Sequence, residues 1–113
     1  MTTPSDSLLL RIFVSEAARH GHQPLYEAIV LKAREARLAG ATVFRGAMGY
    51  GKSSKVHTAK ILALSDDLPV VIEIVDSEAR INAFMADLGS MMPSGMATLE
   101  PVRAFHFTGP PPA

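Results

Sequence analysis

Residues 41–53 read ATVFRGAMGYGKS, a short β-branched and aromatic run that leads directly into a glycine-rich segment. The part from Gly46 to Ser53 matches the phosphate-loop pattern G-x-x-x-x-G-K-[ST] at every fixed position. Further along, residues 70–76 (VVIEIVD) have the form of the metal-binding strand that accompanies such a loop in NTPases. This stretch is therefore compatible with two fold classes: a nucleotide-hydrolysing α/β fold, and a smaller fold in which the glycines only form a loop. The surrounding sequence decides between them.

Four segments have the alternation or composition of β-strands. They are residues 8–14 (LLLRIFV), 41–45 (ATVFR), 70–75 (VVIEIV) and 98–107 (TLEPVRAFHF). Pro101 cannot donate a backbone hydrogen bond, so it places the last of these strands at a sheet edge or beside a bulge.

Two helices are expected between these strands. Pro24 suits the first turn of one helix, whose apolar residues recur at helical spacing up to a C-terminal cap at Gly40. Asp76 and Ser77 are N-cap candidates for the second helix, which the segment 89–95 (GSMMPSG) is expected to end.

The resulting order is strand, helix, strand, long loop, strand, helix, strand. This order predicts an α+β, ferredoxin-like βαββαβ domain: a four-stranded antiparallel sheet with both helices on one face. The opposite face is then left open. We place Arg11, Arg45, Glu73 and Arg103 on this open face, because each interrupts an apolar strand. A face that is half apolar and half charged predicts packing against other copies of the chain.

The phosphate-loop interpretation fits this order poorly. A helix should start at Lys52 and Ser53, yet residues 56–64 (VHTAKILAL) are ambiguous between a strand and a short helix. An NTPase of this kind also needs a parallel sheet with several crossover helices, which is a larger domain. Two interpretations of the loop stay open: an anion-binding segment built on backbone donors and Lys52, and a flexible hairpin whose glycines only permit positive φ.

Composition describes one small globular domain of 113 residues, with disordered ends expected at 1–7 and 108–113 around a domain at 8–107. Eleven basic and eleven acidic residues balance, which gives no case for nucleic acid. The absence of cysteine excludes disulfides and thiolate sites, and no signal peptide or membrane-spanning run is evident, so a cytoplasmic protein without membrane insertion is expected. His20 and His22 could chelate a metal, but a surface pair is favoured.

Three runs, at residues 11–16 (RIFVSE), 24–46 (PLYEAIVLKAREARLAGATVFRG) and 49–81 (GYGKSSKVHTAKILALSDDLPVVIEIVDSEARI), resemble the domain of unknown function 190 family of the PII-like superfamily. The resemblance implies a ferredoxin-like chain assembled as a homotrimer through its open sheet faces. It also implies adenine-nucleotide binding in the clefts between subunits, with 47–65 as the signalling loop. The implied ligand contacts are Gly49, Gly51, Lys52, Ser53 and Ser54, with Arg45 and Arg103 as charge partners.

The family function that this implies is regulation: an effector binds, and the loop at 48–64 then acts on a partner such as a membrane transporter or a metabolic enzyme. No required cofactor and no catalytic residue are expected. The segment 89–96 lacks the basic residue that PII proteins carry there, and the last strand offers a single arginine. The effector could therefore be ATP, ADP, AMP, a cyclic nucleotide or another small anion. Two alternatives stay open: slow nucleotide hydrolysis using Lys52 and Ser53, and a structural or partner-binding trimer without a small ligand.

Overall fold

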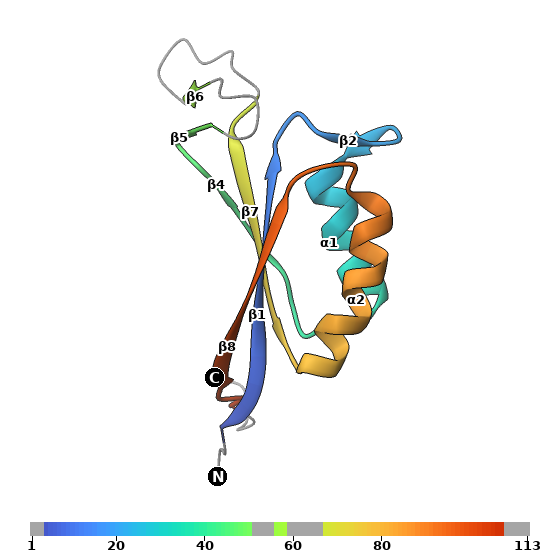
Figure 1. Ribbon diagram of the computed structural model, residues 1–113, viewed down its shortest axis with the longest axis vertical. Coiled ribbons are helices and arrows are strands. Elements are labelled where there is room, and N and C mark those ends of the chain that lie inside the picture. Colours follow the sequence, from blue (N-terminus) through green and yellow to red (C-terminus); the bar gives the residue numbers. More distant parts are fainter. Residues whose placement is uncertain (1–3, 51–55, 59–66, 108–113) are drawn as a thin grey trace, which may run out of the picture.

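The computed structural model describes residues 4–50, 56–58 and 67–107. Its main sheet has four strands in the order β4-β7-β1-β8, and all neighbours are antiparallel. The strands are β1 (Ser5–Ser15), β4 (Thr42–Arg45), β7 (Pro69–Asp76) and β8 (Met96–Ala104). Helices α1 (Leu25–Glu35) and α2 (Glu78–Met91) both lie on one side of this sheet (Figure 1). The predicted ferredoxin-like βαββαβ fold is confirmed.

Two short hairpins complete the described structure. β2 (Arg19–His20) pairs with β3 (Gln23–Pro24) in the connection between β1 and α1. β5 (Met48–Gly49) pairs with β6 (His57–Thr58) at the base of the expected signalling loop. Residues 57–58 are therefore extended rather than helical, whereas 59–64 lie outside the described residues.

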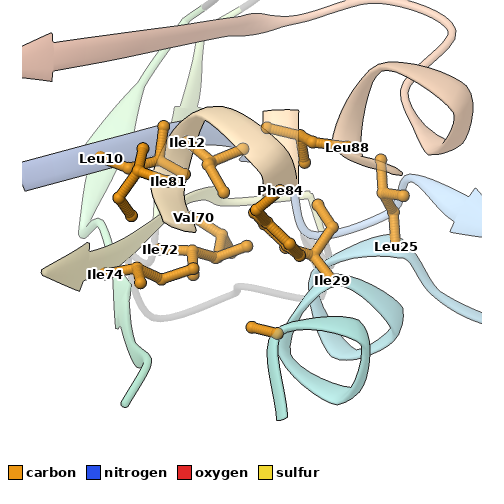
Figure 2. Close-up of a cluster of buried hydrophobic side chains, with 11 residues drawn as sticks. Leu10, Ile12, Leu25, Ile29, Val70, Ile72, Ile74, Ile81, Phe84 and Leu88 are labelled. Carbon is orange, nitrogen blue, oxygen red and sulfur yellow. The ribbon is translucent and has the colours of Figure 1, made fainter. Parts of the chain in front are cut away.

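A single core lies between the helices and one face of the sheet. Alternate residues of β1 and β7 meet the inner faces of α1 and α2 there (Figure 2). Its fully buried members are Leu10, Ile12, Val70, Ile72, Ile74, Leu25, Ile29, Ala33, Ile81, Phe84 and Leu88. Burial of each large member stabilises the fold by about 1.5–3 kcal/mol, so the core fixes how the helices lie on the sheet.

Helix α1 ends at Glu35, well before Gly40. The prediction of Gly40 as its C-terminal cap was therefore wrong. Ala36 is the C-cap, and Arg37 takes the left-handed conformation with φ of 60°. The Leu38 N–H donates to the Ala33 carbonyl at 3.1 Å, which closes a Schellman turn. A non-glycine residue is held in this strained position because its surroundings fix it.

Asp76 and Arg80 provide that support. The Ser77 hydroxyl accepts the Arg80 N–H at 3.3 Å, which confirms Ser77 as the N-cap of α2. The Asp76 carboxylate accepts the N–H of Ser77 at 2.7 Å and that of Ala39 at 2.9 Å. The Arg80 guanidinium donates to the carbonyl of Arg37. The end of α1 is thereby tied to the start of α2.

Three further boundaries differ from the sequence predictions. α2 continues through Gly89 to Met91, because Leu88 and Met91 still pack on the core. β1 begins at Ser5 rather than at residue 8, since residues 5–7 pair with 102–104 of β8. β8 ends at Ala104 and is an edge strand, as Pro101 indicated. The expected tail at 108–113 lies outside the described residues.

Strand register assigns the four mid-strand charges to two different faces. Arg11 lies opposite Glu73, and both occupy the open face as predicted. Arg45 lies opposite Val70, and Arg103 lies opposite Asp6, which puts both arginines on the face that carries the helices. Their placement on the open face was wrong, because alternation defines two sets of residues but not which set faces inward.

Candidate functional site

An apolar row crosses the open face near the loop end of the sheet. Phe44, Val71, Phe13 and Met96 lie opposite one another across all four strands. We call these four residues the apolar row. Phe44 is 50% exposed and Met96 is 57% exposed. Large apolar side chains that stay this exposed in register are typical of a surface that another protein covers.

A charged cluster lies one row further along the same face. The Arg11 Nε donates to Glu73 at 2.8 Å, and its Nη1 donates to Glu100 at 3.1 Å. The hydrogen bond to Glu73 raises the pKa of Arg11 above its ordinary value, with a smaller contribution from Glu100. The guanidinium therefore contacts a carboxylate on each neighbouring strand and stays charged at any physiological pH.

A cavity of about 660 Å³ opens at the loop end of the sheet, where β5 and β6 also lie (Figure 1). We call it the loop-base pocket. Its lining comes from the end of β1, the start of β7, the loop base and the α2–β8 connection. The lining residues are Phe13, Val14, Ser15, Gly49, Tyr50, Asp67, Leu68, Pro69, Val70, Pro93, Ser94, Gly95 and Met96. Its volume is in the range of small-molecule sites.

Pro69 explains the glycines that precede the pocket. The Gly46 N–H donates to the Pro69 carbonyl at 2.7 Å. A Cβ on Gly46 would lie 2.8 Å from the Pro69 Cγ, and one on Gly49 would lie 3.0 Å from the same atom. Gly46, a fixed position of the phosphate-loop pattern, and Gly49, a variable one, are therefore explained by close packing of the chain on this proline.

Gly95 brings the α2–β8 connection against β1 on the other side of the pocket. Its φ is 123°, a region that side-chain-bearing residues rarely adopt. A Cβ here would meet the Met92 Cε at 2.7 Å and the Phe13 carbonyl oxygen at 3.2 Å. The pocket wall at residues 93–96 therefore depends on glycine at this position.

The described residues of the loop-base pocket contribute few polar side chains. The Ser15 hydroxyl donates to the Asp67 Oδ1, and the Ala17 N–H reaches the same oxygen at 3.3 Å. Ser94 and the Tyr50 hydroxyl are the other polar side-chain groups among the described lining residues. Among the lining residues that the structure describes, Asp67 is the one ionisable carboxylate and no lysine, arginine or histidine occurs.

The structure brings together only part of the predicted site. Gly49 lines the loop-base pocket. Arg45 does not line it, because its guanidinium is ion-paired with Glu16. Arg103 lines a separate cavity of about 400 Å³ beside the start of α2. It lies seven residues along β8 from Met96, a separation of about 23 Å. Residues 51–54, which include the predicted contacts Gly51, Lys52, Ser53 and Ser54, lie outside the described residues.

Sequence reasoning missed several lining residues. Tyr50 occupies a variable position of the phosphate-loop pattern, and Ser15 and Asp67 belong to no motif. The sequence analysis noted that the segment 89–96 lacks a basic residue, but nothing in the sequence placed residues 93–96 beside Gly49. These groups come from four distant segments, so only the antiparallel register brings them together.

The phosphate-loop interpretation is excluded by strand direction. β4 and β7 are antiparallel, whereas a Walker arrangement needs parallel strands. Asp76, which would bind the metal, ends β7 seven residues from Pro69, or about 23 Å from the loop base. Its carboxylate instead accepts two backbone N–H groups.

Metal and membrane features are limited in the part of the chain that is described. No group of three or more His, Cys, Asp or Glu side chains is arranged to hold a metal among residues 4–50, 56–58 and 67–107. His20 lies in β2. Within the same ranges no helix combines the length and the hydropathy needed to cross a bilayer.

The DUF190 family, described as "Uncharacterized ACR", matches residues 7–104. The chain belongs to the DUF190 family. A UPF0166 protein of Aquifex aeolicus is 40% identical to this DUF190 chain over 98 residues, which cover 87% of the chain and 92% of the relative. A UPF0166 protein of Methanocaldococcus jannaschii is 35% identical over 80 residues, covering 71% and 73% respectively. The family resemblance seen in the sequence is confirmed.

Solved structures place the DUF190 chain in the PII-like fold. One is CPII, a nitrogen regulatory PII-like protein from Thiomonas intermedia K12 bound to ADP, AMP and bicarbonate, with a TM-score of 0.61 and 16% identity. It aligns over 90% of this chain and 91% of its own. A second CPII structure, bound to ADP and bicarbonate, has a TM-score of 0.56 and the same coverage. At this identity the likeness establishes the fold.

Proposed function

We propose that this DUF190 protein is a PII-like regulator that binds an adenine nucleotide in the loop-base pocket and acts on a partner through residues 48–64. The observation that carries the proposal is the position of the pocket. Gly49 and Tyr50, which begin the loop, are part of its wall. The fold is shared with CPII, whose solved structures hold ADP, AMP and bicarbonate. A ligand in this pocket would contact the loop directly.

The working unit in this proposal is a homotrimer, with the open sheet faces toward one another. Its support is the apolar row, which the chain by itself leaves uncovered. Phe13 and Met96 belong both to this row and to the pocket lining. Covering the row would therefore also close one side of the pocket. The pocket then lies at a cleft between subunits.

Specific roles follow for the predicted contacts. The backbone N–H groups of Gly49 and Gly51 and the side chains of Lys52, Ser53 and Ser54 suit the phosphate end of the ligand. Arg45 would join them after leaving Glu16. Arg103 of the same subunit is too distant, so its contribution requires a neighbouring copy.

The signal would pass through the hairpin at the loop base. The Gly46 N–H donates a hydrogen bond to the Pro69 carbonyl, and Pro69 also lines the pocket. A ligand that contacts Pro69 and Tyr50 would bind one arrangement of the loop more tightly than another. An effector can shift the loop between two conformations only through such a difference in affinity. The partner is a cytoplasmic metabolic enzyme or the cytoplasmic side of a transporter.

Thermal unfolding with a panel of nucleotides and anions tests the proposal. An adenine nucleotide at 100 times its Kd should stabilise the chain by about 2.7 kcal/mol. Guanine and pyrimidine nucleotides serve as controls. If no nucleotide shifts the transition while light scattering shows a trimer, the chain is a structural or partner-binding trimer instead. Phosphate release from ATP, compared with a Lys52→Ala variant, checks for hydrolysis, and none above background is expected.

A further inference from the structure

Arg45 and Glu16 form an ion pair at the border of the loop-base pocket. Arg45 is the last residue of β4 and lies opposite Val70, which lines the pocket. Glu16 directly follows Ser15, another lining residue. Both charged residues therefore lie immediately next to the wall of the pocket, and the pair holds the guanidinium beside the pocket instead of in its lining.

The two members of this pair are not held equally firmly. The Glu16 N–H donates to the Leu68 carbonyl at 2.9 Å, and the Ala18 N–H donates to the Ser15 carbonyl at 3.1 Å, which closes the turn around Glu16. The Glu16 side chain is 18% exposed, whereas the Arg45 side chain is 58% exposed. A rotation of the Arg45 side chain therefore separates the pair while both backbone hydrogen bonds stay in place.

Separating the pair has a cost that a ligand must offset. The Glu16 carboxylate is mostly enclosed, and an enclosed charge that loses its partner is destabilised. A phosphate group at the pocket would offer Arg45 another anion, which a guanidinium can bind in a bidentate manner. Because one anion replaces another, the affinity that Arg45 adds for a ligand is lowered by the attraction that Glu16 already provides.

We infer that Glu16 is a competitor built into the chain, which sets the affinity of the loop-base pocket for phosphorylated ligands by holding Arg45 away from the phosphate. The inference rests on the proposed function and adds the residue that limits ligand affinity at that site. The Glu16 carboxylate binds the guanidinium in the ligand-free chain, and the ligand phosphate binds it in the complex. Removing the charge of Glu16 frees Arg45 and raises the fraction of chains that are ready to bind.

Calorimetric titration of the wild-type chain and of Glu16→Gln with adenosine, AMP and ADP in Mg²⁺-free buffer tests this. Glutamine keeps the backbone N–H that donates to Leu68 and removes only the charge. AMP and ADP should bind the variant about three- to tenfold more tightly, as expected when a partly enclosed ion pair no longer has to be broken. Adenosine has no phosphate and should bind both chains equally.

Two results overturn the inference and leave the proposed function standing. One is equal affinity of the two chains for AMP and ADP, and the other is an equal gain for adenosine, which would indicate a structural change of the pocket. Absence of AMP and ADP binding by both chains overturns the proposed function, and the inference with it.

Two further variants separate the ion pair from a general effect of charge. When Glu16→Gln is combined with Arg45→Ala, no gain in AMP affinity over Arg45→Ala alone is expected, because the arginine to be released has been removed. Glu27→Gln removes the same charge from an exposed position of α1 and should leave AMP affinity unchanged. A gain that persists without Arg45, or an equal gain in Glu27→Gln, contradicts the competition between Glu16 and the phosphate.

Discussion

Gly95→Ala should destabilise the chain and damage the loop-base pocket. Gly95 has φ of 123°, and holding alanine there costs about 1–3 kcal/mol. The added Cβ would also lie 3.2 Å from the Phe13 carbonyl oxygen, which is backbone, and 2.7 Å from the Met92 Cε. The methionine end can move aside, but the backbone contact requires the 93–96 segment to shift. A total loss of about 2–3 kcal/mol in the free energy of unfolding is expected.

Urea unfolding followed by circular dichroism measures this loss, at one fixed protein concentration so that assembly does not confound the comparison. Gly89→Ala is the matched control. Gly89 lies inside α2 with no atom within 4 Å of an added Cβ, so alanine there should stabilise the helix by about 0.8–1.0 kcal/mol. Opposite signs for the two substitutions are the expected result. A Gly95→Ala chain as stable as wild type, with unchanged AMP affinity, would refute the assigned backbone and the pocket wall.

Three other substitutions test separate parts of the structure. Phe44→Glu puts a charge in the apolar row and should convert the proposed trimer to monomers, as measured by light scattering, whereas Leu31→Glu on α1 should not. Dissociation by both variants or by neither would contradict the proposed interface. Arg80→Ala removes the hydrogen bond to the Arg37 carbonyl and should lower the free energy of unfolding, measured by urea unfolding, by about 1–2 kcal/mol. A loss below about 0.5 kcal/mol would show that this link between α1 and α2 contributes little to stability. Lys52→Ala should weaken AMP binding by about 1–3 kcal/mol in calorimetry, and equal affinity would remove Lys52 from the site.

Local chemistry was enough to predict most of the fold. The alternation of residues 8–14 and 70–75 fixed two central strands, and Ser77 was recognised as an N-cap because its hydroxyl can accept an N–H of the first turn. Pro101 indicated an edge strand because it lacks an N–H donor. Each of these inferences depends on neighbours within a few residues.

Features that depend on distant contacts were not predictable in this way. Gly40 was the better residue for a left-handed cap, but Arg37 takes that role because Arg80, far along the chain, binds its carbonyl. The faces of Arg45 and Arg103 depend on register with β7 and β1. The loop-base pocket needs Gly49, Asp67 and residues 93–96 together, which only the folded sheet supplies.

Native mass spectrometry of the wild-type protein with AMP measures assembly and ligand binding in one spectrum. The expected species is a trimer of the 12.1-kDa chain carrying up to one AMP per subunit, with the nucleotide lost in Phe44→Glu monomers. A wild-type monomer, or a trimer that takes up no adenine nucleotide at any concentration tested, would contradict a regulator whose effector site lies at the loop base between subunits.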